Sequence, residues 1–136
     1  MIGNIDVKSS SVHFSVQLMS KYAVANSTIP YERVISSTGD GLGNGTFIVP
    51  KSGTYFFSYD GLNDIAEWTK ITLYINSTPQ PVSSYGNNGV TETMSQSVIL
   101  FLNRGDEVKL VLINGNLSWG LYNTFNGYLV EEQLSL

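Results

Sequence analysis

The sequence predicts an all-β fold, a sandwich or jelly roll of short strands. Alanine, a strong helix former, occurs only at positions 23, 25 and 66, and no window carries an apolar stripe with the 3.6-residue period of a helix. β-Branched and aromatic residues gather instead in runs where apolar and polar side chains alternate. Segments rich in glycine and asparagine, such as 38–45 and 86–89, separate these runs as turns.

Eight strands follow from this pattern, taken along the chain. The first alternates Val, Phe, Val and Leu with His, Ser and Gln, and the third is long and aromatic. The expected strands span residues 12–18, 46–49, 53–62, 70–75, 81–85, 95–102, 107–113 and 124–130. A chain of 136 residues fits one domain. We expect an N-terminal arm at 1–11 and one globular domain at 12–136.

Three of these strands carry apolar side chains on both faces, although a two-layer sandwich buries only one face of each sheet. The expected core residues are Tyr55, Phe57, Val98, Leu100, Leu110 and Leu112. The opposite faces carry Phe56, Ile99, Phe101, Val111 and Ile113. Either loops and the N-terminal arm cover this second set, or it forms an interface between subunits, and the sequence leaves both open.

Composition and charge exclude several classes of function. The chain has 7 Lys and Arg, 11 Asp and Glu, a formal net charge of −4 and no basic run, so nucleic acid is excluded as a partner. No stretch approaches 18 apolar residues, which argues against membrane insertion, and residues 1–6 lack the features of a signal peptide. Cysteine is absent, so there is no disulfide and no thiol nucleophile.

The chain offers no set of catalytic residues. His13 is the single histidine and lies in an alternating strand, so any triad would depend on it. Carboxylates such as Asp60 and Asp64 bracket a turn, but no spacing places two of them across a cleft as a glycosidase requires. We predict that the protein is not an enzyme, and a hydrolase on a β scaffold is only the third hypothesis.

A set of ordered motifs carries a family resemblance. Phe47, Gly53, Tyr55, Phe57 and Tyr59 follow the spacing F-x5-G-x-Y-x-F-x-[FY], and the flanking matches are 29–35, 73–76, 105–108, 120–122 and 125–129. The chain from 12 to 130 thereby resembles the globular heads of the C1q type, within the C1q and tumour necrosis factor superfamily. The resemblance implies a secreted, ten-strand jelly roll assembled as a tight homotrimer. It also implies that Phe56, Ile99, Phe125 and Leu129 lie at or near the three-fold axis.

The resemblance also raises the question of calcium. Some relatives bind calcium near the trimer apex through acidic residues of the loop that here spans 85–94, where Glu92 is the only acid. Three copies of Glu92 around an axis would be needed to hold one ion, and a solvated side chain is the alternative. The sequence implies no other cofactor.

We therefore predict a C1q-like recognition head that binds a protein or glycan through its loops, in innate immunity or cell-surface recognition. The loops 85–94 and 114–122 combine aromatic anchors with adaptable polar groups. Trp68 and Trp119 are suited to stacking on sugar rings or apolar groups. The residues expected to contact ligand are Tyr85, Asn87, Asn88, Glu92, Trp119 and Tyr122. The alternative function is a trimerisation module without a dedicated ligand.

Overall fold

The computed structural model describes residues 11–64, 67–87, 89–118 and 122–134. The strands within these ranges form two antiparallel sheets. They are β1 (His13–Gln17), β2 (Ser27–Thr28), β3 (Arg33–Ser37), β4 (Leu42–Gly43), β5 (Thr46–Ile48), β6 (Gly53–Leu62), β7 (Thr69–Ile75), β8 (Thr78–Gly86), β9 (Thr93–Leu102), β10 (Glu107–Asn114) and β11 (Thr124–Glu132).

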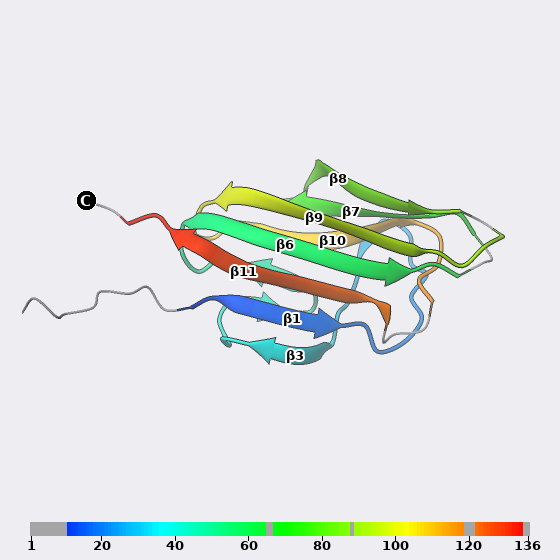
Figure 1. The fold of residues 1–136 in the computed structure, drawn as a ribbon, viewed down its shortest axis with the longest axis horizontal. Helices are drawn as coiled ribbons and strands as arrows, with labels where there is room; N and C mark the ends of the chain where they lie inside the picture. The colour runs from blue at the N-terminus through cyan, green and yellow to red at the C-terminus, as the bar shows by residue number, and fades with distance from the viewer. Residues whose placement is uncertain (1–10, 65–66, 88, 119–121, 135–136) are drawn as a thin grey trace, which may run out of the picture.

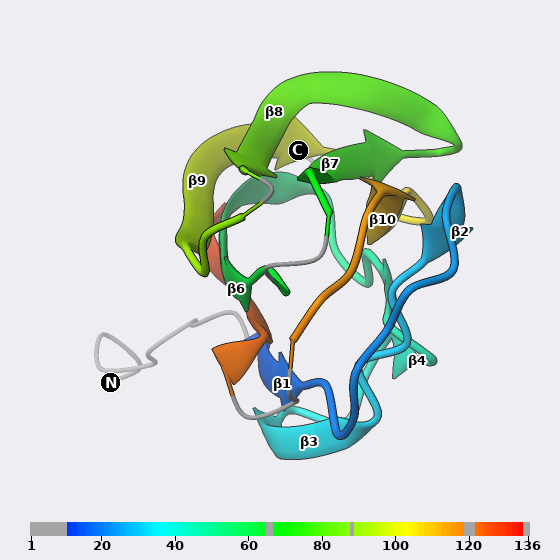
Figure 2. The ribbon, with the colours of Figure 1, turned by 90° about the vertical axis from the view of Figure 1, so that its right-hand side faces the viewer.

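The two sheets pack face to face as a sandwich. One has five strands in the order β3-β1-β11-β6-β9, and faces the viewer in Figure 1. The other has the order β4-β5-β10-β7-β8, with β2 paired to β10, and forms the second layer in Figure 2. This arrangement confirms the predicted all-β sandwich. No helix of the described residues is long and apolar enough to cross a membrane.

Eight expected strands are present, and three short ones were not expected. β2, β3 and β4 lack a clear alternation, and two of them are only two residues long. The strand expected at 81–85 begins earlier, at Thr78, because Asn76 and Ser77 form a tight turn with φ of 50° and 66°. Pairing of Thr78 with Ile75 follows directly from this turn.

Residues 103–106 form the turn expected between the strands that are now β9 and β10. Side chains fix this turn. The Asn103 N–H donates to Oδ2 of Asp106 at 2.8 Å, and Nδ2 of Asn76 donates to Oδ1 of Asp106 at 2.9 Å. The Glu107 N–H in turn donates to Oδ1 of Asn76 at 2.8 Å. The β7–β8 hairpin turn and the connection from β9 to β10, which crosses between the two sheets, are thus joined by hydrogen bonds.

The core lies between the sheets and is rich in aromatic rings. Phe14 packs on Phe47 and Phe125, each with ring centroids 4.9 Å apart. Of the six predicted core residues, Tyr55, Phe57, Leu110 and Leu112 are fully buried, and the other two, Val98 and Leu100, are half-buried and pack against the core. The core prediction is therefore confirmed.

Burial raises the pKa of three tyrosines that face this core. Tyr59 is raised to about 12, Tyr55 is raised, and Tyr31 is raised well above the ordinary range. Removal from water disfavours a phenolate in each case, and the Ser84 hydroxyl partly opposes this at Tyr59. These phenols are structural groups of the core.

Candidate functional site

The outer side of the five-stranded sheet carries exposed apolar side chains. Tyr128 of β11, Phe56 of β6 and Ile99 of β9 lie in register across three adjacent strands. The rings of Phe56 and Tyr128 have centroids 5.2 Å apart, while Ile99 is 63% exposed and Phe101 is 53% exposed. We call the set Phe56, Ile99, Phe101, Tyr128 and Val130 the apolar face.

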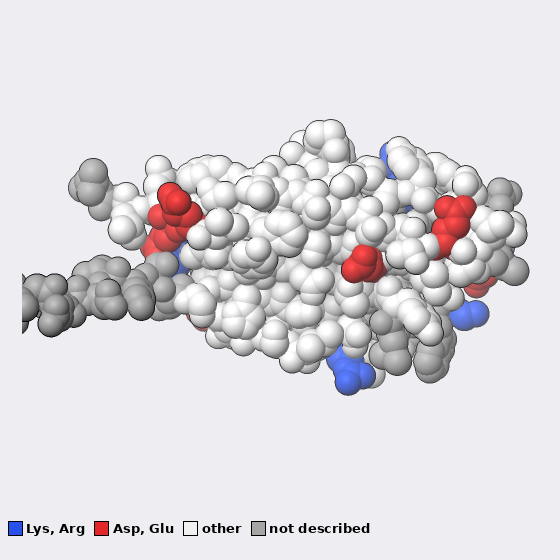
Figure 3. All heavy atoms as spheres, viewed as in Figure 1, with Lys and Arg blue, Asp and Glu red and all other residues white. Residues whose placement is uncertain are grey.

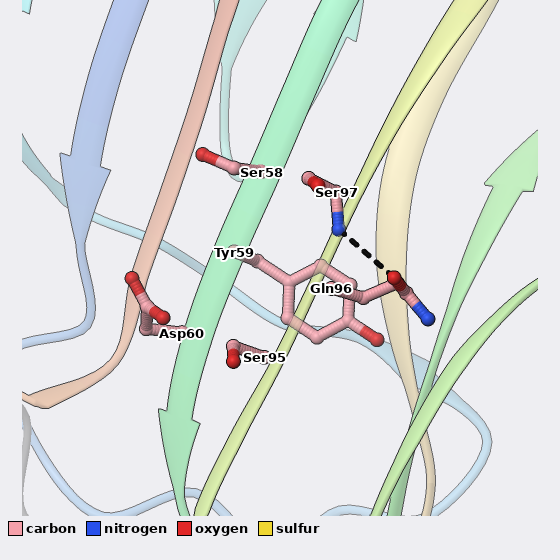
Figure 4. A pocket seen from close by; sticks show the side chains of 6 residues that line it. All are labelled: Ser58, Tyr59, Asp60, Ser95, Gln96 and Ser97. Carbon is pink, nitrogen blue, oxygen red and sulfur yellow. Dashed lines mark hydrogen bonds between the residues drawn. The ribbon is translucent and has the colours of Figure 1, made fainter.

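The same sheet becomes polar further along its strands. Two residues from Phe56 and Ile99, Ser58 pairs with Ser97, and next to them Asp60 pairs with Ser95. A hollow of about 320 Å³ opens between β6 and β9 around these side chains (Figure 4). On the neighbouring strands, the Ser15 hydroxyl donates to Oδ1 of Asn126 at 2.6 Å.

Few charged groups interrupt this side of the molecule. In Figure 3 the middle of the view, over β11, β6 and β9, is almost free of Lys, Arg, Asp and Glu, which gather toward the two ends. A broad apolar and uncharged surface on a sheet is what an association surface requires, since burying it desolvates little charge.

The structure separates the four residues expected near a three-fold axis. Phe56 and Ile99 lie on the apolar face. Phe125 is completely buried within the chain, between Phe14 and Tyr31, so its assignment to an interface is wrong. Leu129 pairs with Tyr55, is half-buried and packs against the edge of the core, so its place at an interface stays a prediction. Tyr128 occupies the outer position of β11 opposite Phe56, and Val130 is exposed at the bulge between Leu129 and Glu131.

The second apolar set, on β10, is closed within the chain. Val111 lies in register between Thr28 of β2 and Thr72 of β7, and it is buried. Ile113 is half-buried at a bulge of the same strand. The outward apolar residues of β10 are therefore covered by the same chain, whereas Ile99 and Phe101 on β9 remain exposed.

A buried asparagine holds the loop that follows β8. Nδ2 of Asn63 donates to the carbonyls of Asn87 at 2.9 Å and Val90 at 3.2 Å. Its Oδ1 accepts the Glu92 N–H at 2.6 Å. Gly86 packs directly on it, so that a Cβ there would come within 2.7 Å of Asn63. The sequence offered no signal for this role beyond an asparagine at the end of an apolar strand.

The predicted ligand-contacting residues are only partly brought together. Asn87 donates from Nδ2 to Oε1 of Glu92 at 3.1 Å, so these two side chains share one surface. Tyr122 is exposed, while Asn88 and Trp119 lie outside the described residues. Tyr85 is also exposed, and its ring contacts Trp68 and Lys70.

Neither a metal centre nor a triad is assembled from the described residues. They contain no group of three His, Cys, Asp or Glu side chains able to hold a metal ion. Glu92 bonds to Asn87 and does not meet a second carboxylate in such a group. His13 lies opposite Tyr128 in the sheet register. A calcium site at Glu92 would therefore need three subunits and stays a prediction.

The fold is that of a C1q-like sandwich, and the comparisons agree. The C1q domain family matches residues 13–130, so the chain belongs to the C1q domain family, which is non-catalytic. The chain is 30% identical over 127 residues to complement C1q tumor necrosis factor-related protein 3 of Mus musculus and of Homo sapiens. Each match covers 89% of this chain and 52% of the relative, so the chain spans about half their length.

Solved structures show the same fold at lower identity. The globular domain of zebrafish complement 1qA protein superposes with a TM-score of 0.75 at 20% identity, covering 90% of this chain and 99% of that one. Murine APRIL gives 0.69 at 10% identity, covering 89% and 100%. The Eiger TNF of S. frugiperda gives 0.68 at 11% identity, covering 92% and 94%. Members of the C1q and tumour necrosis factor family commonly trimerise.

Proposed function

We propose that this C1q domain is a secreted recognition head that assembles as a homotrimer and binds a protein or glycan ligand through its loops. The observation that carries the assembly is the apolar face, where Ile99 and Phe101 remain exposed although they share a rigid sheet with the core. Secretion and a role in innate immunity or cell-surface recognition belong to the same proposal, on the strength of the family.

Water contact with the apolar face is unfavourable, at roughly 25 cal/mol per Å² of apolar surface. A second and third copy of the chain would remove this contact without separating any ion pair there, because the surface over β11, β6 and β9 is almost uncharged (Figure 3). Three identical subunits around an axis form closed, heterologous contacts, the ring symmetry common among homo-oligomers. The family's tendency to trimerise favours three copies over two.

The loops supply the recognition part of the proposal. The loop after β8 is held by three hydrogen bonds to the side chain of the buried Asn63 and by one to its backbone N–H, so Asn87 and Glu92 are presented on a fixed backbone. Preorganised polar groups lose little conformational entropy when they bind. Trimerisation would present three copies of each loop, so weak contacts would sum to avidity on a repetitive target.

Light scattering of the purified chain at micromolar concentration tests the assembly. We expect a trimer for the wild type and a monomer or aggregate for Phe56→Asp, because three unpaired carboxylates would be buried at the axis. Val24→Asp is the matched control, since Val24 is a 57% exposed apolar residue away from the apolar face. A monomeric wild type, or dissociation of the control alone, would refute the assembly.

The alternative is a module that trimerises without a dedicated ligand. The apolar face favours it equally, so the two functions separate only on binding. The recognition function predicts saturable binding that weakens when Asn87 and Glu92 are both replaced by alanine in a chain that stays trimeric. The assembly module predicts a stable trimer that binds nothing on protein and glycan arrays.

A further inference from the structure

Two exposed aromatic rings and a lysine meet on the outer side of the six-stranded sheet. The rings of Trp68 and Tyr85 have centroids 5.6 Å apart and planes inclined at 35°. Trp68 is 41% exposed and Tyr85 is 52% exposed. The ammonium of Lys70 lies 5.2 Å from the centroid of the Tyr85 ring. This cluster lies on the other sheet from the apolar face, and the assembly proposed above leaves it unexplained.

The cluster sits on a rigid part of the fold. Lys70 of β7 and Tyr85 of β8 are directly opposite each other in the sheet register. Nδ2 of Asn114 donates to the Trp68 carbonyl at 2.9 Å and so ties that backbone to β10. Two residues further along each strand, the hydroxyls of Thr72 and Ser83 lie 2.8 Å apart and are hydrogen-bonded. The two rings and the amine are thus presented in a fixed arrangement.

We infer that Trp68, Tyr85 and Lys70 form a binding site for a glycan whose pyranose ring carries a carboxylate. The C–H side of a pyranose packs against aromatic ring faces, because these faces carry partial negative charge. Lys70 supplies up to three N–H donors for the carboxylate. Among the described residues no carboxylate forms an ion pair with Lys70, so its charge is left for a ligand.

The chemistry of the surroundings favours an acidic sugar over the alternatives. A neutral sugar would use the two rings and leave the lysine unmatched. An acidic peptide segment would use the lysine and make little use of two inclined rings. The neighbouring polar groups that reach the surface, on Ser83 and Asn114, are a hydroxyl and an amide, which are the partners that sugar hydroxyls require. A single sugar acid is the ligand that uses every part of the cluster.

This inference names a ligand class for the recognition proposed above and rests on that part of the proposal alone. It does not need the trimer, since all three residues belong to one chain. Assembly would raise the avidity for a polymer of such sugars, but a short soluble oligosaccharide would still bind one cluster. The two claims can therefore fail separately, and the experiment is chosen to separate them.

The experiment uses tryptophan fluorescence of the full chain carrying Trp119→Phe, in which Trp68 is the single tryptophan that remains. The wild-type chain is titrated in parallel by calorimetry, because Trp119 is itself an expected ligand contact. The probe is tetragalacturonate, and the matched neutral probe is its carboxyl-reduced form. We expect a saturable change in Trp68 emission with tetragalacturonate and an affinity at least about tenfold lower for the neutral probe. No saturable change, or equal affinity for the two probes, would overturn the inference, as would equally tight binding of tetraglutamate.

Two lysine variants make the test specific to this cluster. Lys70→Gln should weaken binding at least about fivefold, because the charge-assisted hydrogen bond to the carboxylate is lost. Lys109→Gln is the control, since Lys109 lies on the same sheet opposite a different tyrosine, Tyr74. Equal loss in both variants would overturn the site. Light scattering of the same samples reports the trimer independently, so a monomer that still binds refutes only the assembly.

Discussion

The outer faces of the two sheets differ in how far neighbouring strands cover their apolar side chains. On the six-stranded sheet, Val111 is buried between its neighbours and the hydroxyls of Thr72 and Ser83 bond to each other. On the five-stranded sheet, Ile99 and Phe101 stand exposed beside Phe56 and Tyr128. The part of the first face around β10 is closed within one chain, whereas the apolar face of the five-stranded sheet is open to solvent. An apolar strand pattern alone therefore does not mark an interface, since only the neighbours decide which face stays open.

The largest expected effect comes from comparing the two sides of β6, where Phe57 points inward and its neighbour Phe56 points outward. Phe57 is 1% exposed and lies in the aromatic core, so Phe57→Ala should lower the free energy of unfolding by about 3–5 kcal/mol at any protein concentration. Phe56→Ala should have a smaller effect that grows with concentration, because it acts through association. Urea midpoints at two concentrations measure both, and equal, concentration-independent losses would contradict the assignment of faces.

The next prediction places the same charge on each outer face. Val111→Asp should destabilise the single chain by roughly 3 kcal/mol, because the carboxylate would be buried without a partner. Ile99→Asp should leave a chain that folds, as judged by circular dichroism, and does not assemble. If Val111→Asp folds with a wild-type urea midpoint, the six-stranded face is not closed within the chain as described.

A smaller effect is expected at the loop that leads from β8 of the six-stranded sheet to β9 of the five-stranded sheet. Asn63→Ala would leave one N–H and two carbonyls without their partner, at a cost of about 1–3 kcal/mol. We expect a lower urea midpoint and faster hydrogen exchange of the Glu92 amide. Asn87→Ala is the control, since it removes only an exposed bond to Glu92. Unchanged exchange at Glu92 in the Asn63 variant would show that the loop is held otherwise.

The alternation of side chains was sufficient to predict the long strands, the core and the existence of a second apolar face. It did not place Phe125, which the family resemblance put near the axis and which the register of β11 with β6 turns into the core. The short strands β2 and β4 escaped prediction because two residues carry no period. The pairing of Lys70 with Tyr85, and the three bonds made by Asn63, depend on registers and loop closures that join residues distant in the sequence.

The smallest effect concerns the polar contact that joins the inner faces of the two sheets, between Tyr59 of β6 and Ser84 of β8. At neutral pH, Tyr59→Phe should cost about 1 kcal/mol, the net value of a hydrogen bond.

Burial raises the Tyr59 pKa from 10 to about 12, so the folded chain keeps a proton that the unfolded chain loses. This contribution is fully present below pH 10 and is lost as the pH rises toward 12. A two-unit shift is worth about 2.7 kcal/mol, more than the starting difference. The free energies of unfolding of the wild type and Tyr59→Phe, measured in urea at one protein concentration, should therefore meet and then cross within that window. Tyr31 and Tyr55 remain in both proteins, and burial is the first cause of both raised pKa values, so most of their shared loss cancels in the difference. A constant difference from pH 9 to pH 12 would mean that the Tyr59 phenol ionises as easily in the folded chain as in the unfolded one.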